Sequence, residues 1–141
     1  MIRPRNPLAT LLRLRGIQER RERGALARAE RALADSRSQV AARKQVLDAL
    51  SMAGGPLSAA QLRAVRMQGD HAYELLRAAR EAAASAEAER DAAAAAASRA
   101  AIRRKSTERL VERRDLEAQA LARTAAARAL DELVVTRRSS S

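Results

Sequence analysis

A single break interrupts a sequence that otherwise consists of helix-forming residues, and this break is the strongest constraint on the fold. Gly54, Gly55 and Pro56 stand between two long stretches that are dominated by Ala, Arg, Leu and Glu. Those four residue types have high helix propensity, whereas Gly and Pro disfavour the interior of a helix. The sequence therefore predicts two helices, joined either by a flexible linker or by a tight turn.

The residues that follow the break favour the tight turn. Ser58 and Gln61 have the spacing of a capping box, in which each side chain bonds to the backbone N–H of the other residue. Leu57 and Leu62 have the spacing of a hydrophobic staple, which fixes how the chain enters a helix. A flexible linker between unrelated domains needs neither device, so we expect the two helices to fold back on each other.

The first helix is predicted over residues 7–52. Asn6 can cap its first turn, and Pro7 suits the first helical position, where no backbone N–H is needed. A row of mostly apolar residues then recurs every seven positions, which is half of a coiled-coil seam. The members of this row, called the first seam, are Leu12, Glu19, Leu26, Leu33, Val40 and Leu47.

The second helix is predicted over residues 58–135, after a turn at 53–57 and before a frayed end at 136–141. A second seam of apolar or small residues, with one Arg, lies near its end: Leu116, Ala120, Arg123, Ala127, Leu130 and Val134. We therefore expect an all-α fold in which two long helices form an antiparallel coiled-coil hairpin, with the second helix longer than the first. Residues 1–141 are expected to form a single coiled-coil domain.

The charge balance points to a binding protein. The 28 Lys and Arg residues exceed the 17 Asp and Glu residues, which gives a formal net charge of +11. In a hairpin, the basic segments 1–23 and 99–114 both lie away from the turn. A cationic chain binds nucleic-acid phosphates without specificity. Acidic residues are interspersed throughout, however, and Tyr73 is the single aromatic residue that could stack on a base.

Nothing in the sequence indicates an enzyme, a cofactor or a metal site. There is no Cys, and the single His71 has only its neighbour Asp70 as a titratable companion. Adjacent residues on a helix point in different directions, so this pair is no catalytic arrangement. No stretch has the roughly 20 apolar residues of a membrane span, and the basic N-terminal segment does not read as a signal peptide. We expect a cytoplasmic protein.

Three stretches give the chain a specific resemblance. They are PLATLLRLRGIQERRERGALARAERAL, then AQLRAVRMQGDHAYELL after the Gly-containing break, and the closing KSTERLVERRDLEAQALARTAAARALDELVVTRR. Together they span most of the chain, which resembles the FliJ family of the flagellar export apparatus, related to the YscO-type proteins of type III secretion. The resemblance implies a non-enzymatic stalk at the cytoplasmic face of the membrane. It would link a hexameric export ATPase to the cytoplasmic domain of the export gate, and some members escort export chaperones.

The resemblance also implies two contact surfaces on this chain. Residues facing the ATPase ring would be Arg13, Arg15, Arg20, Arg21, Arg23, Arg113, Arg114, Asp131 and Glu132. Residues facing the export gate would be Leu47, Leu50, Met67, Tyr73 and Leu76, which are bulky side chains near the turn. Two alternatives stay open: a structural coiled coil that associates with itself, and a basic helical protein that binds nucleic acid.

Overall fold

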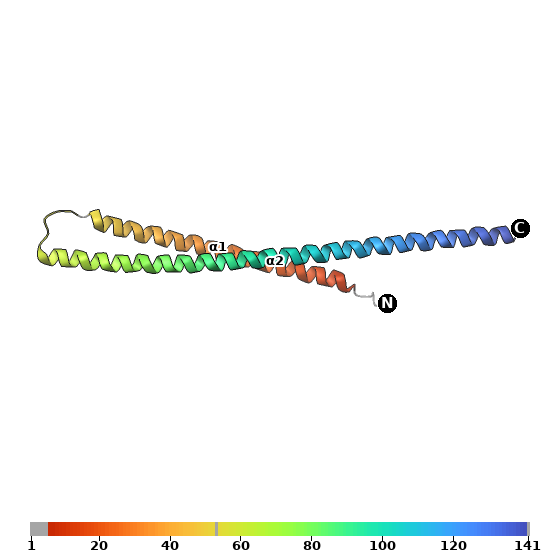
Figure 1. Cartoon of the computed structure of the whole chain (residues 1–141), viewed down its shortest axis with the longest axis horizontal. Helices are drawn as coiled ribbons and strands as arrows, with labels where there is room; N and C mark the ends of the chain where they lie inside the picture. Colours follow the sequence, from red (N-terminus) through yellow and green to blue (C-terminus); the bar gives the residue numbers. More distant parts are fainter. Residues whose placement is uncertain (1–5, 53, 141) are drawn as a thin grey trace. The chain divides into compact units, whose positions relative to one another are not determined.

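The protein folds into two α-helices, which the computed structural model describes over residues 6–52 and 54–140 (Figure 1). Helix α1 is Pro7–Met52, with 46 residues, and helix α2 is Ala59–Ser139, with 81 residues. The two helices pack as a hairpin, and no strand occurs in the described ranges. The predicted all-α fold with a longer second helix is therefore confirmed.

The start of α1 is capped as predicted. The backbone N–H of Leu8 donates to Asn6 Oδ1 at 3.1 Å, and the Thr10 hydroxyl donates to the Asn6 carbonyl at 3.4 Å. The first of these bonds satisfies one of the N–H groups that the first helical turn leaves without an intrahelical partner. A side-chain cap of this kind stabilises a helix by about 1 kcal/mol.

The start of α2 has the predicted capping box. The backbone N–H of Ser58 donates to Gln61 Oε1 at 2.9 Å, while the N–H of Gln61 donates to Ser58 Oγ at 3.2 Å. Just before it, Gly55 has a φ of 148°, which residues with a Cβ rarely adopt. The connection thus combines a glycine-dependent backbone with a defined helix start. Residue 53, which the sequence placed in the turn, lies outside the described residues.

Helix α2 extends to Ser139, so residues 136–139 are helical although the sequence placed them in a frayed end. The Thr136 hydroxyl donates to the Glu132 carbonyl at 2.7 Å, and the Ser139 hydroxyl donates to the Thr136 carbonyl at 3.0 Å. Arg137 and Arg138 in the last turn suit the negative end of the helix dipole. No Gly or Pro in this stretch interrupts the helix.

The chain divides into two compact units, and each helix contributes to both. The terminal unit consists of the N-terminal segment up to Glu19 together with the segment from Ala100 onward. The turn unit is Arg20–Arg99 and contains the connection between the helices. That the chain acts as one domain stays a prediction.

The core of the turn unit is narrow and rich in Ala. Leu76 is 2% exposed and Leu33 is 5% exposed, and the other buried side chains of this unit are Ala72, Ala86 and Ala97. At its edge, Arg37 and Glu87 approach across the two helices at 3.9 Å. Both of these side chains are more than half exposed, so the pair adds little stability. Packing of Leu and Ala side chains therefore holds this pair of helices together.

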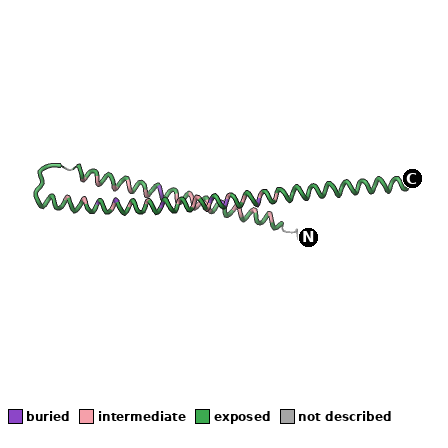
Figure 2. The backbone as a smooth tube through the Cα atoms, viewed as in Figure 1, coloured by how far each residue is buried: buried purple, intermediate pink, exposed green. Residues whose placement is uncertain are grey.

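All six members of the first seam are shielded from solvent, which supports the coiled-coil interpretation of α1. Glu19 and Leu33 are buried, and the other four residues are half-buried. The second seam behaves differently, because all six of its members are exposed. Figure 2 shows buried and half-buried residues on both helices, whereas the last part of α2 is exposed throughout.

Candidate functional site

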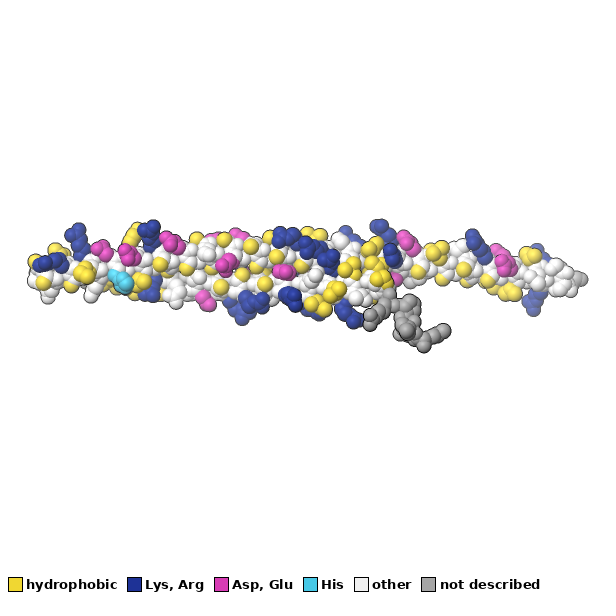
Figure 3. Space-filling view, turned by 90° about the horizontal axis from the view of Figure 1, so that it is seen from below, with side chains coloured by type: hydrophobic (Ala, Val, Ile, Leu, Met, Phe, Trp, Pro, Cys, Tyr) yellow, Lys and Arg dark blue, Asp and Glu magenta, His cyan; other side chains and the backbone are white. Residues whose placement is uncertain are grey.

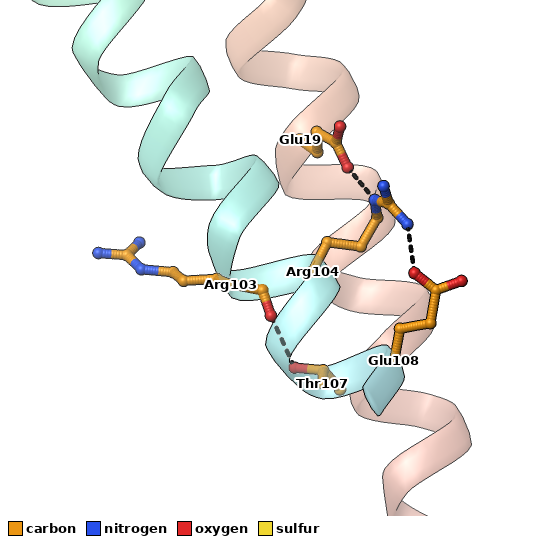
Figure 4. A network of polar contacts seen from close by, with 5 residues as sticks. All are labelled: Glu19, Arg103, Arg104, Thr107 and Glu108. Carbon is orange, nitrogen blue, oxygen red and sulfur yellow. Dashed lines mark hydrogen bonds and ion pairs between the residues drawn. The ribbon is translucent and has the colours of Figure 1, made fainter. Parts of the chain in front are cut away.

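The terminal unit has a polar centre around Glu19, the one polar member of the first seam. Glu19 of α1 is 4% exposed, and its carboxylate accepts a hydrogen bond from Nε of Arg104 on α2 (Figure 4). Arg104 also donates to Glu108 Oε2, one helical turn further on, at 2.9 Å. The hydrogen bond and the charge of Glu19 raise the pKa of the Arg104 guanidinium, so it stays charged beside the carboxylate.

A buried hydroxyl completes this centre. Thr107 is 8% exposed and donates its hydroxyl proton to the Arg103 carbonyl at 2.9 Å. The Arg103 side chain points to the opposite side of α2 from the Glu19 carboxylate (Figure 4). A polar residue in a coiled-coil seam fixes the register of the two helices, since a shifted pairing leaves its charge buried without a partner. Glu19 is thus suited to align α1 with α2 in the terminal unit.

The residues predicted to face the ATPase ring fall in both units. Arg13, Arg15, Arg113, Arg114, Asp131 and Glu132 belong to the terminal unit, whereas Arg20, Arg21 and Arg23 belong to the turn unit. All are exposed except the half-buried Arg15, whose guanidinium donates to Gln18 Oε1 at 3.2 Å. The set is a series of accessible charges, and its role in ring binding stays a prediction.

Among the described residues, the last part of α2 is the most accessible. Every residue from 112 to 140 is exposed, and this includes the large side chains of the second seam (Figure 2). Leu116 and Leu130 are each 63% exposed, and Val134 is 51% exposed. Helix α1 has 46 residues and α2 has 81 residues, so α1 is 35 residues shorter. We call residues 112–139 the open segment of α2.

The residues predicted to face the export gate lie in the turn unit and differ in exposure. Met67 is 75% exposed and Tyr73 is 58% exposed, so a partner can reach both. Leu47 and Leu50 are half-buried, and Leu76 is 2% exposed. Leu76 therefore packs in the core of the hairpin. The role of all five in gate binding stays a prediction.

A groove of about 270 Å³ lies between the two helices of the turn unit, beside this set. It is largely apolar, and only Leu50 of its lining was singled out from the sequence as a contact residue. The lining residues are Arg43, Val46, Leu50, Gln68, His71, Ala72 and Leu75. The sequence offered no signal for Val46, because its exposure depends on how far the two helices stand apart near the turn.

Within residues 6–52 and 54–140, no group of His, Cys, Asp or Glu is arranged to hold a metal ion. No helix in the same ranges is both long enough and apolar enough to cross a membrane. The accessible features there include exposed helix faces and grooves along the helices.

Two long helices that pack as a hairpin and leave apolar helix faces uncovered define the class of this chain as a coiled-coil interaction protein. The profile of the flagellar FliJ protein family matches residues 4–140. The chain belongs to this family and is a component of the flagellar export apparatus. The family is one of structural export proteins, not of enzymes. Neither the curated proteins nor the solved structures contain a match to this chain.

Proposed function

We propose that the protein is a non-enzymatic stalk that links the hexameric export ATPase to the cytoplasmic domain of the export gate. One observation carries this proposal: apolar side chains are exposed on both units, with the open segment on the terminal unit and Met67 and Tyr73 on the turn unit. Exposed apolar side chains that gather in one part of a surface mark interaction sites. Two such regions, one on each unit, fit two different partners at the cytoplasmic side of the membrane.

The open segment fits a partner that contributes large side chains to the contact. The middle of the second seam consists of Ala120, Arg123 and Ala127. A second copy of this segment would place small and charged side chains against each other and would bury little apolar area. A central pore of an ATPase ring can surround the helix, and its side chains can contact the apolar seam and the charges of Asp131 and Glu132. This argument favours the ring over self-association.

A pair of variants with opposite effects tests the proposal. Leu130→Ser with Val134→Ser should weaken capture of the purified export ATPase and leave capture of the gate domain unchanged. Met67→Ser with Tyr73→Ser should do the reverse. All four residues are more than half exposed, so neither double variant is expected to disturb the fold. Variants that weaken both interactions equally, or neither, would count against separate contact surfaces.

The purified wild-type chain and the Leu130→Ser, Val134→Ser variant also test whether the protein associates with itself. Light scattering of the purified chain should give the mass of a monomer, 15.3 kDa. A stable dimer that is lost in the Leu130→Ser, Val134→Ser variant would instead support the structural coiled coil. Escort of export chaperones is a further part of the proposed role, which capture of purified chaperones by the turn unit of the full chain would test.

A further inference from the structure

We propose that the outer face of α2 between residues 102 and 113 binds the anionic phospholipid surface of a membrane. This face consists of Ile102, Lys105, Ser106, Arg109 and Arg113, with Arg103 beside it. The residues recur three or four positions apart, so they form one stripe along the helix. At about 1.5 Å per residue the stripe is about 17 Å long. The inference does not depend on the function proposed above, although Arg113 at the end of the stripe also belongs to the set predicted to face the ATPase ring.

The stripe is turned away from α1. In the same stretch, Ala100 and Thr107 are buried, and Arg104 reaches Glu19 of α1. These residues define the inner face of α2, and helix geometry places Ile102, Lys105 and Arg109 on the opposite face. All members of the stripe are exposed. Figure 4 shows the Arg103 side chain projecting from α2 on the side away from Glu19.

The stripe itself consists of cations, one Ser and one Ile, and acidic residues lie on its flank. On the face that Figure 3 shows, Asp and Glu side chains lie among the Lys and Arg side chains along the chain. Between Ile102 and Arg113 the acids are Glu108, which Arg104 binds at 2.9 Å, and Glu112, which is exposed at the edge of the stripe near Lys105. Among the described residues, Arg103, Lys105 and Arg109 make no side-chain ion pair or hydrogen bond. Their charges are available to an external anion.

An anionic bilayer fits this stripe better than a nucleic acid does. Ile102 is 61% exposed and stands next to the cations, and Leu110 is 40% exposed on the flank near Arg103. Basic side chains with aliphatic residues among them suit the headgroup region, where the charges meet lipid phosphates and the apolar groups leave water. The phosphate backbone of a duplex offers Ile102 no apolar contact, and the stripe has no aromatic residue for stacking on bases.

The expected affinity follows from the number of cations. Each Lys or Arg near an anionic surface strengthens binding by about fivefold, so removal of three cations should weaken it by about 100-fold. The attraction is electrostatic and falls off over a Debye length of about 10 Å at 0.1 M salt. Binding should therefore weaken steeply as salt is added.

Vesicle co-sedimentation of the full chain tests the proposal. The wild-type chain should bind vesicles that contain phosphatidylglycerol and should not bind vesicles of phosphatidylcholine alone. Arg103→Gln, Lys105→Gln and Arg109→Gln together should lower this binding by about 100-fold. The matched control is Arg28→Gln, Lys44→Gln and Arg66→Gln, which removes three exposed cations from the turn unit and should bind nearly as well as the wild type.

Two further measurements separate the other outcomes. Ile102→Ser should weaken vesicle binding, whereas it should not affect binding to duplex DNA. The triple Gln variant keeps the residues predicted to face the ATPase ring and should still capture the ATPase, so failure of one proposal is distinguishable from failure of the other. The inference would be overturned by equal losses of vesicle binding in the triple variant and its control, or by binding to vesicles of phosphatidylcholine alone. It would also be overturned if the chain bound DNA more tightly than vesicles and this binding depended on the same three cations.

Discussion

Replacement of Leu76 by Ala should destabilise the protein by about 2–3 kcal/mol, because this is the least exposed large side chain of the described hairpin. The substitution removes three carbon groups, each worth about 0.8 kcal/mol when fully buried, which gives about 2.4 kcal/mol. The cavity left by the substitution adds to this loss of stability. Because Ala72 and other neighbours are small, the two helices can move together and partly fill the cavity. The total loss should therefore lie near the low end of the range for replacement of a buried Leu by Ala.

The matched control is Leu62→Ala, which truncates the same side chain on the same helix at a site that is 59% exposed. Its loss should be about 1 kcal/mol, since less than half of the side chain is shielded from water. The change in helix propensity is the same in both variants and cancels in the comparison. Urea unfolding followed by far-UV circular dichroism gives both free energies.

The result also bears on the surface predicted to face the export gate. Leu76→Ala should weaken gate binding only through loss of packing, whereas Tyr73→Ala should weaken gate binding and leave the unfolding free energy nearly unchanged. A Leu62→Ala variant that is as destabilised as Leu76→Ala would refute the assignment of Leu76 to the core. A Leu76→Ala variant of wild-type stability that fails to bind the gate domain would make it a contact residue instead.

Three further perturbations test local features. Gly55→Ala should destabilise the turn by about 1 kcal/mol, since φ at this position is 148°; equal stability in thermal unfolding would show that the turn tolerates another backbone conformation. Ser58→Ala removes one half of the capping box and should lower stability by about 1 kcal/mol, with Ser106→Ala as a surface control. Glu19→Gln should lower the melting temperature because it leaves Arg104 without its buried carboxylate, whereas Glu19→Leu together with Arg104→Leu, which replaces both partners by apolar side chains, should restore it; the opposite order would refute the role of this pair.

Much of the secondary structure was predictable because its determinants are local. Asn6 caps α1, and Ser58 with Gln61 caps α2, through bonds that span four residues or fewer. Gly55 adopts a backbone conformation that suits glycine, at the break that the sequence marks. The end of α2 was harder to place, because Thr136 bonds back to Glu132 and lets the helix continue to Ser139.

The candidate contact surfaces were less predictable, because exposure depends on which helix face finds a neighbour. Tyr73 and Leu76 lie three positions apart and were grouped as one contact set, yet one is 58% exposed and the other 2%. The sequence marked 99–114 as a basic segment, but which of its cations are unpaired on the outer face depends on the pairing of Arg104 with Glu19 and Glu108.

The sequence by itself determined two helices, their start signals and the turn that joins them, because these depend on propensities and hydrogen bonds between near neighbours. The tertiary structure decided which helix faces are covered. It brought Glu19 beside Arg104, which lies 85 residues away along the chain. The seam at Leu116 and Leu130 stays exposed even though it has an apolar spacing like that of the first seam. The physical reason is length: a seam is buried only where a second helix reaches it, and α1 is 35 residues shorter than α2, with 46 residues against 81.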